Sequence, residues 1–191
     1  MRLTAAAAAL LVPLLSACVA IYTPPLEISA APDSRHGYLY GRFKLERVDR
    51  HDDSIRAGLA VDPGADADTP TDGSAGENYT IEFAPDALPK AIAVKPGTYH
   101  IGELIGTVGN HELLARKELS GPFTAPFDVH AGEACYVGDM IIEVRGNYGR
   151  RDDTIWKLSS LKDNYDPSTA QLRQTLPGFA QLRTRNILAE P

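Results

Sequence analysis

The residue types most often used as metal ligands or nucleophiles are thinly spread along the chain. Its histidines are His36, His51, His100, His111 and His130. No two of them have the H-x-x-x-H spacing that presents two zinc ligands on one helix face. His130 and Cys135 flank a four-residue turn, so a hairpin would bring them together as a zinc-type pair or as a Cys-His dyad. Because neither arrangement has an identifiable third member, we expect ordinary strand-end residues and predict no catalytic residue, metal or cofactor here.

Two segments one hundred residues apart have nearly the same order of side chains. Arg50-His51-Asp52-Asp53-Ser54-Ile55 is echoed by Arg150-Arg151-Asp152-Asp153-Thr154-Ile155, and each precedes a β-favouring run. Aspartate with serine or threonine satisfies backbone N–H groups where a strand begins, so turn formation is the simpler interpretation. If both turns lie at one end of the fold, Asp52, Asp53, Asp152 and Asp153 form a weak candidate site for Ca²⁺.

The segment Asp62–Asn78 is acidic and rich in Gly and Pro. Its oxygens at Asp66, Asp68, Asp72 and Glu77 follow positions 1, 3, 7 and 12 of an EF-hand loop. Position 6, where the sharp turn requires glycine, is Thr71, and no flanking helices are predicted. We therefore expect a solvated loop, and we consider it a candidate partner surface together with the turn Gly146–Asp153.

The first residues predict where the protein is delivered. Arg2 is the only charge in the first 26 residues, and Leu3–Leu15 is an apolar run interrupted only by Thr4 and Pro13. As a helix this run is about 20 Å long, which is short of the roughly 30 Å hydrocarbon core of a bilayer. It is therefore typical of the hydrophobic region of a signal peptide and not of a permanent membrane span.

The run ends in Leu15-Ser16-Ala17-Cys18, which resembles the lipobox of bacterial lipoproteins. The resemblance implies cleavage after residue 17, acylation of Cys18 with palmitate among the chains, and a firm bilayer anchor, because two or more acyl chains are needed for stable attachment. Residue 19 is Val and not the Asp that favours inner-membrane retention in enteric bacteria. We expect the periplasmic face of the outer membrane. An ordinary secretory signal with a cysteine nearby is the alternative.

The composition excludes some partners. The 191 residues carry a formal net charge of −6, with a pI near 5.3. Such a chain lacks the clustered Lys and Arg of a nucleic-acid-binding surface, so no nucleic-acid partner is predicted. Two cysteines cannot form a disulfide framework, and acylation of Cys18 leaves Cys135 as the only thiol. We expect Cys135 to be a buried structural residue, with an intermolecular bridge or a reactive thiol as alternatives.

Short β-favouring runs separated by turn residues fill the middle of the chain. They are 38–48, 54–61, 79–83, 91–94, 99–108, 113–119, 123–130, 135–144 and 154–160. A helical pattern occurs only after residue 165, so the helical crossovers typical of a parallel sheet are missing. The sequence predicts a mainly β fold: an antiparallel β-sandwich of the immunoglobulin or transthyretin-like type, with about eight or nine strands and a C-terminal helix.

The domain organisation follows from these segments. Residues 1–17 are the signal peptide, 18–36 a lipidated tether, 37–163 the sandwich and 164–191 a helix packed on it. In the last segment, Leu172, Leu176, Phe179 and Leu182 form an apolar stripe, and Pro177-Gly178 should break the helix. We expect the stripe to cover the sandwich, and docking of a partner is the alternative.

Three stretches carry a wider resemblance: Lys95-Pro96-Gly97-Thr98-Tyr99-His100-Ile101-Gly102, Phe127–Tyr136 and Val137-Gly138-Asp139-Met140. They resemble uncharacterised proteobacterial lipoproteins with a transthyretin-like or carboxypeptidase-regulatory-like β-sandwich. The resemblance implies a membrane-anchored, non-catalytic interaction or accessory module of the cell envelope with an envelope protein as partner. The alternatives are a purely structural envelope protein and a hydrolase using His130, Asp139 or the paired aspartates.

Overall fold

The computed structural model describes residues 35–48, 55–63, 79–86, 88–108, 112–120, 124–145 and 155–189. Within these ranges the chain is mainly β, with ten strands and one α-helix. The strands are β1 (Gly37–Arg47), β2 (Ile55–Pro63), β3 (Tyr79–Glu82), β4 (Pro89–Val94), β5 (Gly97–Val108), β6 (Glu112–Glu118), β7 (Phe127–Val129), β8 (Glu133–Arg145), β9 (Ile155–Lys162) and β10 (Arg183–Asn186). Each predicted β-favouring run corresponds to one of β1 to β9, whereas β10 was not predicted.

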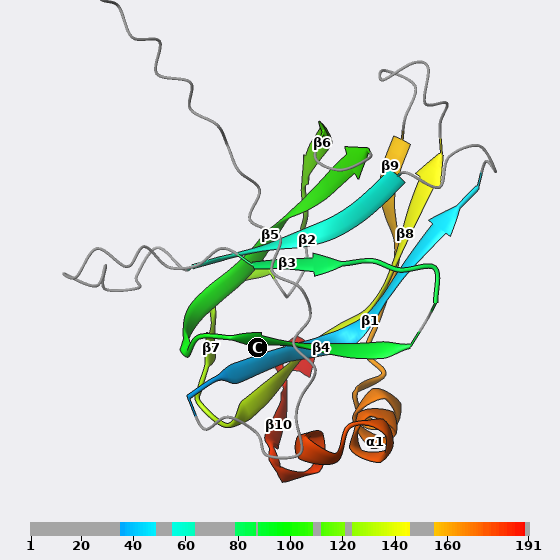
Figure 1. Cartoon of the computed structure of the whole chain (residues 1–191). Coiled ribbons are helices and arrows are strands. Elements are labelled where there is room, and N and C mark those ends of the chain that lie inside the picture. The colour runs from blue at the N-terminus through cyan, green and yellow to red at the C-terminus, as the bar shows by residue number, and fades with distance from the viewer. Residues whose placement is uncertain are drawn as a thin grey trace, which may run out of the picture.

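The strands form two sheets that lie as separate layers (Figure 1). One sheet, called sheet A here, has the order β10-β8-β1-β4, with β9 also paired to β8. The other, sheet B, has the order β3-β2-β5-β6, with β7 also paired to β5. Alternate side chains of both sheets meet in one apolar core, which includes Leu39, Phe43, Leu59, Ile101 and Val137.

The strands of sheet B are all antiparallel, but sheet A is mixed. Its two longest neighbours, β1 and β8, run parallel, and β10 also runs parallel to β8. This differs from the purely antiparallel arrangement that the sequence predicts. The reason is that the chain between β1 and β8 passes through β2, β3 and β5 to β7 of the opposite sheet. Strands of the second layer therefore provide the crossover that was expected to need a helix.

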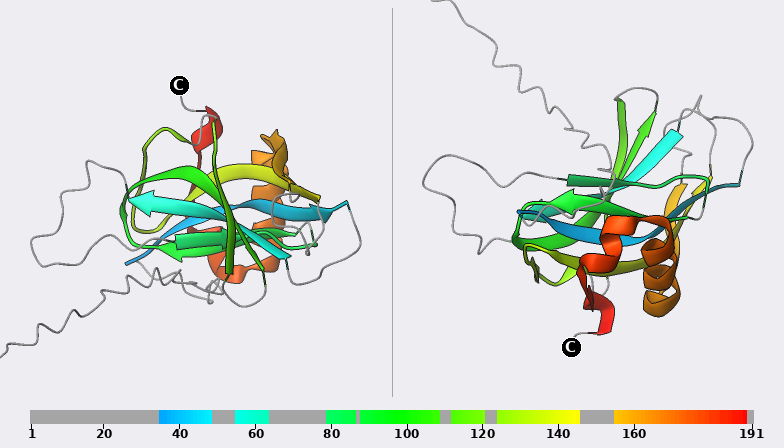
Figure 2. Two further views of the ribbon diagram at one scale, coloured as in Figure 1. Left: turned by 90° about the horizontal axis from the view of Figure 1, so that it is seen from above. Right: turned by 60° about the horizontal axis from the view of Figure 1, so that its bottom comes forward.

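The C-terminal segment covers the outer face of sheet A, as the right-hand view of Figure 2 shows. Helix α1 spans Tyr165–Thr175 and is followed by the 3₁₀ turn Pro177–Gln181, so the expected break at Pro177 is confirmed. Leu172, Phe179 and Leu182 pack with Tyr40 and Tyr136 of the sheet in a second apolar cluster. The segment then continues as β10 and a last 3₁₀ turn, Ile187–Ala189, so the helix occupies only part of the predicted range 164–191.

In the part of the chain that the structure describes, no helix is long and apolar enough to cross a membrane.

Candidate functional site

The structure does not bring His130 and Cys135 together as a hairpin pair. The strand that leads to His130, β7, pairs with β5 of sheet B, whereas Cys135 belongs to β8 of sheet A. The turn between them therefore joins two sheets. His130 is exposed, while Cys135 is fully buried in the core, as the sequence predicted for this thiol. Among the described residues, no group of three or more His, Cys, Asp or Glu side chains could hold a metal ion.

Several predicted sites lie outside the described residues. They are Cys18, the aspartates Asp52, Asp53, Asp152 and Asp153, the turn Gly146–Asp153 and the loop from residue 64 to residue 78. The strand ends that flank the aspartate segments are described and lie side by side. Arg47 is paired in register with Val144, and the backbone N–H of Val48 donates to the carbonyl of Val144 at 3.0 Å. The described ends of β1 and β8 therefore lie at the same end of the fold, and calcium binding stays a prediction.

The carboxylate of Asp139 on β8 is the centre of a dense hydrogen-bond network. The Asp139 side chain is 10 % exposed. It accepts hydrogen bonds from Ser168 Oγ at 3.0 Å, the Tyr136 hydroxyl at 3.0 Å and Asn164 Nδ2 at 3.1 Å. On its other side, Arg42 approaches with its backbone N–H at 3.2 Å and with Nε at 3.3 Å. The carboxylate thus ties β1, β8 and the start of α1 to one point.

A bulge in β8 places Asp139 on this face. Tyr40 pairs with Tyr136 and Gly41 pairs with Gly138, so Val137 is an extra residue on β8. Gly138 has a φ of +113°, a backbone conformation that residues with a Cβ rarely adopt. Because of the extra residue, Tyr136 and Asp139 lie on the same outer face although they are three positions apart.

Two tyrosines form the floor beneath α1. The Tyr40 hydroxyl shares a 2.7 Å hydrogen bond with Thr169 Oγ1, and the Tyr136 hydroxyl accepts from the Asn164 backbone N–H at 2.9 Å. Both side chains are fully buried, and burial raises the pKa of both phenols well above the ordinary value of 10.0. These tyrosines therefore stay neutral at any physiological pH and hold the helix on the sheet.

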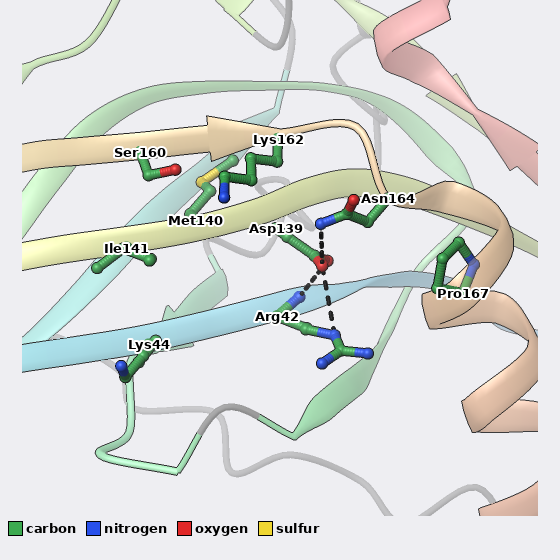
Figure 3. A pocket seen from close by; sticks show the side chains of 9 residues that line it. All are labelled: Arg42, Lys44, Asp139, Met140, Ile141, Ser160, Lys162, Asn164 and Pro167. Atoms are coloured by element: carbon green, nitrogen blue, oxygen red, sulfur yellow. Dashed lines mark hydrogen bonds and ion pairs between the residues drawn. The ribbon is translucent and has the colours of Figure 1, made fainter.

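A hollow of about 350 Å³ opens beside this network, where α1 leaves part of sheet A uncovered (Figure 3). It is lined by Arg42, Lys44, Asp139, Met140, Ile141, Ser160, Lys162, Asn164 and Pro167. β1 contributes Arg42 and Lys44, β9 contributes Ser160 and Lys162, and the start of α1 contributes Pro167. Three of these side chains are cationic and one is anionic, so the lining carries a net positive charge although the whole chain is acidic.

Of the residues named for the hydrolase alternative (His130, Asp139 or the paired aspartates), only Asp139 lines the hollow, and the paired aspartates lie outside the described residues. No histidine lines the hollow, and none of the donors to the Asp139 carboxylate is a histidine. In a Ser-His-Asp arrangement the imidazole lies between hydroxyl and carboxylate, whereas here Ser168 Oγ donates directly to Asp139. The groups in the hollow are suited to binding an anion by charge and hydrogen bonding.

A second buried carboxylate holds the C-terminal strand. Glu133, with 2 % of its side chain exposed, forms ion pairs with Arg183 at 2.8 Å and with Arg185 at 3.3 Å. Both arginines belong to β10, and Arg185 Nη2 also lies 3.5 Å from Cys135 Sγ. These contacts attach β10 to β8 and close the core over the thiol.

Sequence reasoning did not identify Arg42, Lys44, Lys162 or Ser168 as members of one site. They come from strands and a helix far apart in the chain, and no spacing rule relates them. One signal was present in the sequence: Gly138-Asp139 interrupts an otherwise apolar strand, and a glycine within a strand often marks a bulge.

The comparisons with known proteins add no family. No family model matches the chain, and no curated protein does. Among solved structures, the crystal structure of a leucine-rich repeat protein from Bacteroides thetaiotaomicron aligns with a TM-score of 0.30 and 11% sequence identity. The alignment covers 59% of this chain and 14% of that chain.

Proposed function

We propose that this chain is a lipid-anchored module of the bacterial cell envelope that acts through binding and not through catalysis. The observation that carries the proposal is the segment Leu15-Ser16-Ala17-Cys18 directly after the apolar run Leu3–Leu15. In this proposal Cys18 is acylated, the domain faces the periplasm from the outer membrane, and an envelope protein is its partner. In the same proposal, residues 18–36 are the lipidated tether that connects the anchor to the domain.

We assign the two facing sheets to the β-sandwich class, of the immunoglobulin or transthyretin-like type. The support is the apolar core that both sheets share. Sandwiches of this kind present strand edges and loops at which partners can dock.

Metabolic labelling with alkyne-tagged palmitate tests the anchor. We expect the wild-type chain to incorporate the label and Cys18→Ala to lose it entirely. Cys135→Ala is the matched control, because it removes the other cysteine and leaves the N-terminal segment intact. Labelling that survives Cys18→Ala, or that is absent from the wild type in a bacterial host, would contradict acylation of Cys18. The N-terminal segment would then be interpreted as an ordinary secretory signal.

Crosslinking in intact cells tests the partner. The acylated protein is crosslinked at native abundance, and the adducts are identified by mass spectrometry after the outer membrane has been separated on a density gradient. A recurring protein adduct in that fraction supports an accessory module. A protein found in the inner-membrane fraction, or without any specific adduct, contradicts the proposed location or the proposed role respectively.

A further inference from the structure

We propose that the hollow beside Asp139 binds a phosphate group, either of a small phosphate monoester or of a lipid headgroup. The inference concerns the folded domain and does not depend on whether Cys18 is acylated. It rests on the charges that line the hollow, on which of them are already neutralised, and on its size.

The negative charge in the hollow is already satisfied. Asp139 is nearly buried and accepts from Arg42, Ser168, Tyr136 and Asn164. Its Arg42 partner also donates from Nη2 to Gln171 Oε1 at 2.8 Å. The carboxylate therefore neutralises one cation of the lining, and it has little capacity left to accept from a ligand.

Two lysines of the lining face an incoming anion, and one of them is already paired with a carboxylate. Lys44 forms an ion pair with Glu46 at 2.5 Å on the partly exposed edge of the site, so part of its charge is already offset. Lys162 is exposed and has no ion pair with any described residue. Lys44 lies on β1 and Lys162 on β9, the strands that flank β8 on opposite sides (Figure 3). An anion seated over β8 would lie between them.

A phosphate fits this arrangement better than a carboxylate does. A phosphate monoester carries a charge of about −1.5 to −2 at pH 7, so it is attracted more strongly to Lys162 and to the partly offset charge of Lys44 than a carboxylate with one charge. The phosphodiester of a lipid headgroup also carries one charge, but it presents two oxygens in the tetrahedral geometry of phosphate. The Ser160 side chain in the lining adds a hydroxyl donor, and Ile141 and Pro167 provide apolar surface for a short organic group. A volume of about 350 Å³ is at the small end for ligand sites, so the hollow suits a headgroup-sized molecule.

The test uses the reactivity of Lys162 toward an amine-labelling reagent, read by mass spectrometry on the full chain in micelles of a non-ionic detergent that contains no phosphate. An ammonium paired with phosphate releases its proton less readily, so less neutral amine is present to react. We expect glycerol phosphate, compared with chloride at equal ionic strength, to slow labelling of Lys162 about fivefold, the upper range for an exposed pair. Lys157, exposed on the same strand and outside the hollow, is the internal control and should not change.

A second arm distinguishes the two sources of phosphate. Vesicles that contain phosphatidylglycerol, without added phosphate, should protect Lys162 if a lipid headgroup is bound, and should leave it reactive if only soluble monoesters are bound. In either case Lys44→Gln should weaken the protection. The proposal is overturned if neither arm protects Lys162, or if Lys157 is protected to the same extent, because that would indicate general charge screening.

Discussion

Replacing Asp139 by Asn should weaken the packing of α1 on sheet A, and the loss of unfolding free energy can be estimated from the hydrogen bonds and the ion pair of this side chain. The amide keeps the shape of the carboxylate, but it loses the charge and replaces one accepting oxygen with an NH₂ group. Ser168 Oγ, Tyr136 Oη and Asn164 Nδ2 all donate to this side chain, so at least one donor loses its acceptor and meets another donor. The ion pair with Arg42 Nε is lost as well.

The expected loss of unfolding free energy is about 3 kcal/mol. A hydrogen bond to a charged group contributes about 1.5–3 kcal/mol, and breaking a buried ion pair costs about 3–5 kcal/mol. We take the lower end because the Arg42 side chain is 31 % exposed, so solvent screens part of its interaction. The loss is local in origin, so amide hydrogen exchange should accelerate in α1 before it accelerates in sheet B.

Urea unfolding of the full chain in non-ionic detergent, followed by near-ultraviolet circular dichroism, measures this loss. Glu143→Gln is the matched control: it lies on the same strand and face, and its partner Arg145 is 57 % exposed. We expect that control to change stability by less than about 0.5 kcal/mol. If Asp139→Asn lowers the free energy of unfolding by no more than Glu143→Gln does, the Asp139 carboxylate does not hold α1 on sheet A.

Three further predictions concern single positions. In urea unfolding, Gly138→Ala should destabilise the protein by about 2 kcal/mol more than Gly132→Ala. Both glycines have a positive φ, but only at Gly138 would an added Cβ meet side chains, the nearest at 2.6 Å. Burial raises the pKa of Tyr40 in the folded state. The contribution of neutral Tyr40 to the free energy of unfolding is therefore fully present below the unfolded pKa of 10.0, and it falls as the pH rises above that value. Urea midpoints at pH 9 and pH 11 should therefore differ less in Tyr40→Phe than in the wild type. Glu133→Gln should release β10 and make Cys135 reactive to iodoacetamide in the native protein, whereas the wild-type thiol stays protected.

The strands were predictable where the sequence alternates or forms a continuous apolar run. Tyr79–Glu82 alternates between buried and partly buried residues, and the apolar run in β8 corresponds to a strand buried on both faces. β10 was not predictable in this way. Its sequence, Arg183-Thr184-Arg185-Asn186, has neither β-branched runs nor alternation, and its position depends on Glu133, fifty residues earlier.

The candidate site was less predictable than the strands, because it depends on register. A strand with period two places Asp139 on the same face as Val137 and Cys135, which belong to the core between the sheets. The bulge at Gly138 reverses that assignment. Secondary-structure propensities do not detect a one-residue insertion in a strand. Ser168 and Asn164, whose hydrogen bonds to Asp139 stabilise the bulged register, come later in the chain.

This dependence couples the register of β8 to the docking of α1. Without the bulge, the Asp139 carboxylate would point into the apolar core, where an unpaired charge costs several kcal/mol. With it, the carboxylate meets donors that α1 and the residue before it supply. A Cβ at Gly41 would collide with the carbonyl oxygen of Gly138. β1 therefore needs glycine at this position in order to lie this close to β8. The parallel pair at the centre of sheet A and the helix outside it therefore stabilise each other, and the positive hollow exists only when both are in place.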